Sequence, residues 1–86
     1  MPGTADKSPV AVIGAGSWGT ALAMQIAYGG RTAYLWGHDK AEMQALADDR
    51  SNEHFLPGLG FPDNLKVLLD LTELPESCNH YLVVVP

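Results

Sequence analysis

One short segment near the start of the chain, residues 10–19, restricts the fold more than any other part of the sequence. Residues 9–13 are small or β-branched, as in a strand buried on both faces. Gly14, Gly16 and Gly19 follow with the spacing G-x-G-x-x-G, and apolar residues then recur at helical spacing over residues 17–28. A glycine fingerprint between a strand and a helix is much more specific than the fingerprint alone. The segment therefore predicts the strand–turn–helix unit that binds the pyrophosphate of a dinucleotide.

The three glycines have different roles in such a turn. Gly14 allows the tight exit from the strand, Gly16 leaves room for a phosphate beside the backbone, and Gly19 lets the helix pack closely on the sheet. The unpaired N–H groups at the start of the helix then face the phosphates. The alternative is a glycine-rich turn with no ligand. A P-loop is excluded because no Gly-Lys-Ser/Thr follows at the right spacing.

The rest of the chain alternates between strand and helix patterns. Gly29 and Gly30 end the first helix, Asp39 is a candidate cap of a second helix, and Thr72 is a candidate cap of a short helical turn. The elements expected after the first helix are strands at 31–36, 65–69 and 81–85, a helix at 40–49, an irregular connection at 51–64 and a helical turn at 71–76.

This alternation predicts an α/β fold in the order β-α-β-α-β-β, with a parallel sheet and right-handed crossovers. Residues 1–8 are polar and are expected to form a flexible tail, and residues 9–86 are expected to form the N-terminal portion of a Rossmann-like domain. A parallel sheet needs helices on both faces, and here the chain ends on a central-looking strand with nothing after it. The chain is therefore expected to be an incomplete domain, the alternative being a small half-domain that folds alone.

Composition excludes several other classes of protein. The net charge is −5 and the basic residues are scattered, which gives no support to a nucleic-acid surface. No apolar run is long enough to span a bilayer, so no membrane association is expected. The single cysteine, Cys78, suits a reducing compartment and is expected to be an inert thiol, which favours a cytoplasmic location. His54 and His80 match no metal-ligand spacing, so no metal site is expected.

Three further residues are candidate cofactor contacts. Ser17 can meet a phosphate oxygen or act as a simple N-cap, and Trp18 can wall the cofactor site or serve in packing. His38 is the first polar side chain after the second predicted strand, where an acidic residue would favour NAD and a basic one would tolerate the 2′-phosphate of NADP. A histidine there leans towards NADP(H) without excluding NAD(H), and an exposed turn histidine is the alternative.

Residues 12–23, Val-Ile-Gly-Ala-Gly-Ser-Trp-Gly-Thr-Ala-Leu-Ala, resemble the opening of the bacterial-type NAD(P)-dependent glycerol-3-phosphate dehydrogenases. Later stretches agree with that family, namely residues 35–39, 50–52, 55–58 and 82–86. The resemblance implies cofactor contacts at Ser17, Trp18 and His38, and only weakly at Pro86. A non-catalytic nucleotide-binding module and another Rossmann dehydrogenase are the alternatives.

The resemblance also implies the reaction of a longer, two-domain protein. That reaction is the reduction of dihydroxyacetone phosphate to sn-glycerol 3-phosphate by NADPH or NADH, a step that feeds phospholipid synthesis. A homodimer remains open for the whole protein. Lys7, Lys40 and Lys66 do not match the family's catalytic lysine, so no catalytic residue is assigned and this chain alone is expected to be inactive.

Overall fold

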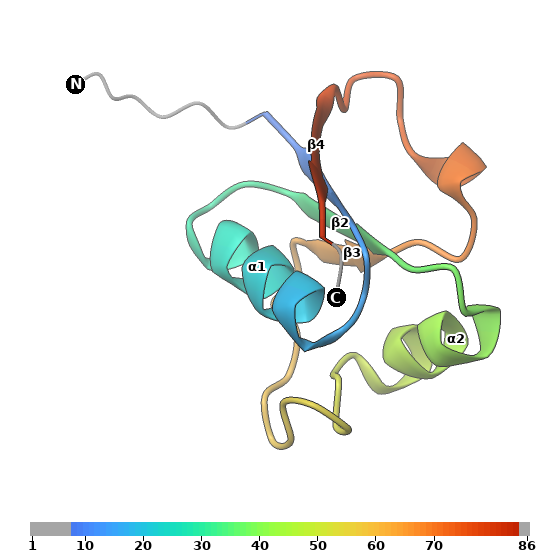
Figure 1. Ribbon diagram of the computed structural model, residues 1–86. Helices are drawn as coiled ribbons and strands as arrows, with labels where there is room; N and C mark the ends of the chain where they lie inside the picture. The colour runs from blue at the N-terminus through green and yellow to red at the C-terminus, as the bar shows by residue number, and fades with distance from the viewer. Residues whose placement is uncertain (1–7, 85–86) are drawn as a thin grey trace.

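The four strands form one parallel sheet in the order β3-β2-β1-β4 (Figure 1). The structure is a computed structural model and describes residues 8–84. The elements along the chain are β1 (Val10–Ile13), α1 (Ser17–Tyr28), β2 (Ala33–Trp36), α2 (Lys40–Asp49), β3 (Leu65–Val67), the 3-10 helix η1 (Leu71–Glu73) and β4 (His80–Val83). The predicted α/β class and order of elements are confirmed. The flexible tail predicted for residues 1–8 lies, except for Ser8, outside the described residues.

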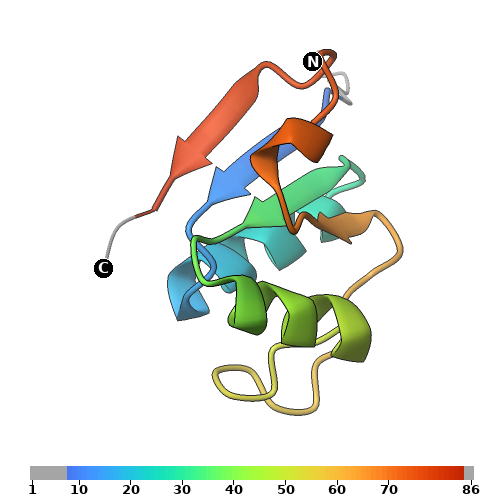
Figure 2. The same ribbon diagram turned by 90° about the vertical axis from the view of Figure 1, so that its right-hand side faces the viewer.

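Both α-helices pack against one face of the sheet. Alternation along the strands places Val12, Ala33, Leu35 and Leu65 on this face. They form one core with the buried residues of the helices, which are Ala23, Met24 and Ala27 of α1 and Met43 and Leu46 of α2. Figure 2 shows both helices on the lower side of the strands.

The other face of the sheet is covered less completely. η1 lies across the sheet from α1 (Figures 1 and 2). Ile13, Tyr34 and Trp36 are half-buried on this face, whereas Tyr81 and Val83 of β4 are exposed. Among the described residues, β4 therefore packs mainly through its backbone pairing with β1.

Side-chain hydrogen bonds explain why two strands are shorter than predicted. The Asn64 amide donates to the carbonyl oxygens of Ala27 and Arg31 at 2.7 and 2.9 Å, which ties the segment before β2 to the end of α1. After β3, the N–H groups of Leu69 and Asp70 donate to the Glu73 carboxylate at 3.0 and 3.1 Å, so the chain turns away from the sheet.

One predicted helix cap is confirmed and another is wrong. The Asp39 carboxylate accepts a hydrogen bond from the N–H of Glu42 at 3.1 Å and caps α2. The cap of η1 is Asp70 rather than Thr72, because the Asp70 carboxylate accepts from both the N–H and the hydroxyl of Thr72 at 2.9 Å. These bonds lower the pKa of Asp70, since they favour its charged form.

Candidate functional site

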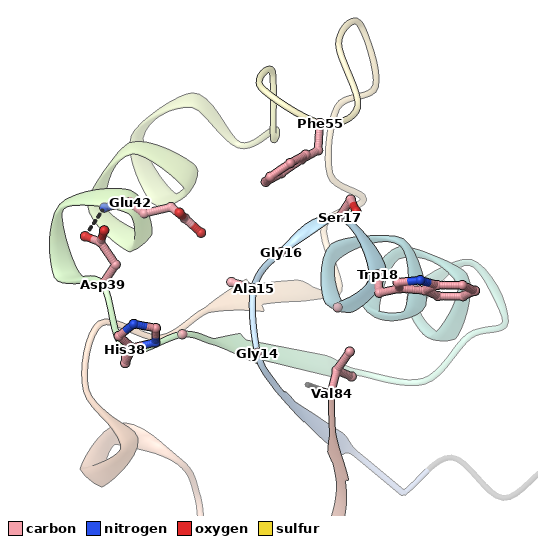
Figure 3. Close-up of a pocket in the computed structure, with 12 residues that line it drawn as sticks. Gly14, Ala15, Gly16, Ser17, Trp18, His38, Asp39, Glu42, Phe55 and Val84 are labelled. Carbon is pink, nitrogen blue, oxygen red and sulfur yellow. Dashed lines mark hydrogen bonds between the residues drawn. The ribbon is translucent and has the colours of Figure 1, made fainter. Parts of the chain in front are cut away.

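A pocket of about 580 Å³ lies beyond the carboxyl ends of β1 and β2 (Figure 3). β1 lies between β2 and β4, so the strand order reverses at this point. Ligands of open α/β sheets bind in the crevice at such a reversal. The pocket is lined by the six residues predicted from the sequence, Gly14, Gly16, Ser17, Trp18, Gly19 and His38, and by Ala15, Gly37, Asp39, Glu42, Phe55 and Val84.

At two positions of the glycine loop there is no room for a side chain. Gly14 has φ +123°, and a Cβ there would collide with the carbonyl oxygen of Val84 just after β4. A Cβ on Gly19 would overlap the carbonyl oxygen of Gly14. These two glycines therefore let the loop fit closely between α1 and the sheet.

Gly16 differs from its two neighbours because a Cβ there would meet no atom within 4 Å. It is the N-cap residue of α1, with φ −66° and ψ −168°, a conformation open to any residue. Ser17 is the first helical residue, so its interpretation as the N-cap is wrong. The first turn of α1 holds no acidic residue and receives no side-chain cap from the described residues.

The start of α1 is thus prepared for an anion. The N–H groups of the first helical turn have no acceptor within the helix, and the helix dipole is positive at this end. The open space beside Gly16 lets a phosphate approach these donors. A pyrophosphate fits the donors and the space that the structure shows here.

The remaining lining residues stand on two sides of the glycine loop. Figure 3 shows His38, Asp39 and Glu42 on the side of α2, and Trp18 with Val84 on the other side. The Trp18 side chain is 71% exposed, so it contributes little to packing among the described residues. An elongated ligand that crosses the loop would meet polar groups at one end and apolar groups at the other.

Sequence reasoning assigned six of the twelve lining residues to the site and missed the other six, among them Gly37, Glu42 and Phe55. Glu42 lies in the first turn of α2, and Figure 3 shows its carboxylate directed into the pocket. Phe55, in the connection after α2, lines the pocket, and Figure 3 shows its ring above the glycine loop. A Cβ on Gly37 would stand 2.9 Å from the Cβ of Ala15, which explains a glycine between β2 and α2. The connection also holds Leu56, Leu59 and Phe61, so its composition alone gave no signal that singles out Phe55.

Cys78, His54 and His80 do not line the pocket. Cys78 is buried, and its thiol contacts the carbonyl oxygens of Pro9 and His80 at 3.6 and 3.7 Å. His54 packs edge-on against Phe55. Residues 8–84 contain no group of three or more side chains able to hold a metal ion. None of the helices in this part of the chain is long and apolar enough to cross a membrane.

Comparisons with known proteins point to one family. Residues 9–86 match the family model described as NAD-dependent glycerol-3-phosphate dehydrogenase N-terminus. Curated proteins named glycerol-3-phosphate dehydrogenase, with NAD(P)+ as cofactor, are 49% identical in Shewanella baltica and 52% identical in Shewanella frigidimarina, each over 94% of this chain and 24% of the relative. A crystal structure of glycerol-3-phosphate dehydrogenase from Coxiella burnetii matches 93% of this chain and 25% of its own, with TM-score 0.86 and 39% identity. The chain thus spans about a quarter of the length of these relatives.

Proposed function

Because the chain belongs to the family of NAD-dependent glycerol-3-phosphate dehydrogenase N-terminal domains, we propose that its pocket binds NADH or NADPH. The observation that carries this proposal is the open space beside Gly16 at the uncapped start of α1. Backbone N–H groups there would hold the pyrophosphate, and Gly14 and Gly19 would keep the loop close to the sheet.

The two sides of the loop suggest how the cofactor lies. Asp39 is engaged as the cap of α2, so His38 and Glu42 are the side chains left to meet the adenosine ribose. Trp18 and Val84 would then border the nicotinamide end. Pro86, which the family resemblance associates weakly with this end, lies outside the described residues. His38 can donate to a 2′-phosphate and Glu42 can accept from a 2′-hydroxyl, which supports use of both cofactors.

For the whole protein we propose the reduction of dihydroxyacetone phosphate to sn-glycerol 3-phosphate. The names of the relatives support this reaction, although this chain corresponds to about a quarter of them. The reduced nicotinamide supplies the hydride when it is bound. The residues of this chain bind the pyrophosphate and ribose and hold the nicotinamide at the edge of the sheet, which is an orienting role.

The product of this reaction would feed phospholipid synthesis. A cytoplasmic location is part of the same proposal, supported by the single cysteine, which suits a reducing compartment. A homodimer is proposed for the whole protein on the family resemblance alone.

Calorimetric titration of the protein encoded by the complete gene with NADPH and with NADH tests the cofactor proposal. We expect saturable binding of at least one of them. A parallel assay follows nicotinamide absorbance after addition of dihydroxyacetone phosphate. Cofactor binding without turnover would favour a non-catalytic binding module, and absence of binding to either cofactor would refute the proposal.

A further inference from the structure

The connection between α2 and β3 carries Phe55 over the pocket and is fastened at its base. The N–H of Phe61 donates to the carbonyl oxygen of Arg50 at 2.7 Å. The Arg50 guanidinium in turn donates to the carbonyl oxygen of Pro62 at 2.8 Å. Ser51 and Gly60 form an isolated antiparallel bridge. These contacts close residues 51–60 into a loop whose ends are fixed, so the conformation within the loop sets the place of Phe55.

Asn52 links this loop to the glycine loop through buried hydrogen bonds. Its amide nitrogen donates to the Thr20 hydroxyl oxygen at 2.9 Å, and that hydroxyl donates to the carbonyl oxygen of Ala15 at 3.0 Å. Asn52 is 3% exposed and Thr20 is fully buried. Loss of either partner would leave a buried polar group without its bond, which costs more than the bond itself contributes.

The bond to Ala15 has a consequence for the pocket. The carbonyl of Ala15 and the N–H of Gly16 belong to one peptide unit, which is planar and trans, so the two groups point in opposite directions. With the carbonyl held toward the buried Thr20, the N–H of Gly16 is directed to the open side of the loop. Through this bond, Thr20 holds the N–H of Gly16 toward the space proposed for the phosphate.

Asn52 also holds the backbone around Phe55. Its side-chain oxygen accepts a hydrogen bond from the N–H of Phe55 at 3.3 Å, and its main-chain carbonyl accepts from Leu56 at 2.7 Å. One buried amide is thus bonded both to the hydroxyl that holds the Ala15 carbonyl and to the backbone of Phe55.

From this geometry we propose that Asn52 is a positioning residue of the dinucleotide site, acting through Thr20 on Gly16 and directly on Phe55. The inference rests on the proposed function, because it requires a dinucleotide in the pocket. A preformed site lowers the cost of ordering these groups when the ligand binds.

The test is calorimetric binding of NADPH to variants of the protein encoded by the complete gene. We expect Asn52→Ala to weaken binding about tenfold and Thr20→Val about three- to fivefold, since each removes buried hydrogen bonds that orient the site. Thr20→Ser keeps the hydroxyl and should restore affinity to within about twofold of wild type. The double variant Asn52→Ala, Thr20→Val should bind no more than about twofold more weakly than Asn52→Ala, since both act through one relay.

Asn64→Ala is the matched control. Its amide also makes two hydrogen bonds, to Ala27 and Arg31, but it lies away from the pocket lining. We expect this variant to lower the melting temperature and leave the affinity for NADPH unchanged. If Asn52→Ala does not fold, the contrast between Thr20→Val and Thr20→Ser still decides whether the relay from Asn52 through the Thr20 hydroxyl to Ala15 sets the affinity for NADPH.

Two kinds of failure are distinguishable. If the wild-type protein does not bind NADPH or NADH, the proposed function fails and this inference fails with it. If the wild-type protein binds, the positioning role alone is overturned by Thr20→Val with wild-type affinity, by additive effects in the double variant, or by an equal loss of affinity in Asn64→Ala.

Discussion

Substitution of Gly16 by alanine separates the role of this residue in binding from any role in folding. Gly16 has φ −66° and ψ −168°, and a Cβ there would meet no atom within 4 Å. The folded protein therefore accommodates a methyl group at this position without strain. The space that the methyl group would fill is the space assigned to the pyrophosphate.

The expected effect on stability is small. Replacing glycine by alanine at a compatible position contributes about 0.4–1 kcal/mol through the unfolded state. Alanine is also a poorer N-cap than glycine, which offsets part of this gain. The free energy of unfolding of Gly16→Ala should therefore lie within about 1 kcal/mol of wild type.

The expected effect on binding is much larger. A methyl group beside the helix N-terminus would displace a phosphate from one charge-assisted hydrogen bond, worth about 1.5–3 kcal/mol. The dissociation constant for NADPH should rise about tenfold to a hundredfold.

Thermal unfolding and calorimetric titration measure the two effects separately. Gly60→Ala is the matched control, because its Cβ would make only an ordinary contact, 3.9 Å from the carbonyl oxygen of Arg50, and Gly60 does not line the pocket. Wild-type affinity in a folded Gly16→Ala variant would show that the pyrophosphate does not lie beside Gly16.

Three other substitutions test neighbouring parts of the account. Gly19→Ala should destabilise the protein by about 1–3 kcal/mol in denaturant unfolding, because its Cβ would overlap the carbonyl oxygen of Gly14; unchanged stability would contradict that packing. Glu42→Gln removes a negative charge from the pocket and should shift the ratio of dissociation constants about two- to fivefold in favour of NADPH over NADH, and no shift would place the ribose elsewhere. Asp39→Ala removes the cap of α2 and should cost about 1 kcal/mol in thermal unfolding, whereas an unchanged melting temperature would show that the cap is dispensable.

Local sequence patterns predict the parts of this fold that depend on local chemistry. The β1–α1 unit follows from an apolar run, three glycines and a helical period within a short stretch of chain. The Asp39 cap follows from the preference of short polar side chains for helix starts. The cap at Thr72 was predicted wrongly, because Asp70 and Glu73 together form a capping box that competes with it.

The parts of the site that depend on tertiary packing could not be predicted in the same way. The place of Phe55 at the pocket depends on a loop that is closed by the hydrogen bond between Arg50 and Phe61. It also depends on Asn52, which is bonded to Thr20, a residue 32 positions earlier in the chain. The glycine motif, by contrast, predicts correctly that Gly16 leaves open space and that Gly19 packs closely, which in the structure is against the Gly14 carbonyl oxygen.

The most direct test of the central claim is an NMR titration of the isotopically labelled protein with NADPH and NADH, following the backbone amide signals. The account predicts that the amide signals of Gly16, Ser17 and Trp18 shift saturably, with one common dissociation constant, while that of Asn64, away from the pocket, stays in place. Saturable shifts confined to other segments, with these three amide signals unmoved, would contradict the claim that the glycine loop binds the dinucleotide.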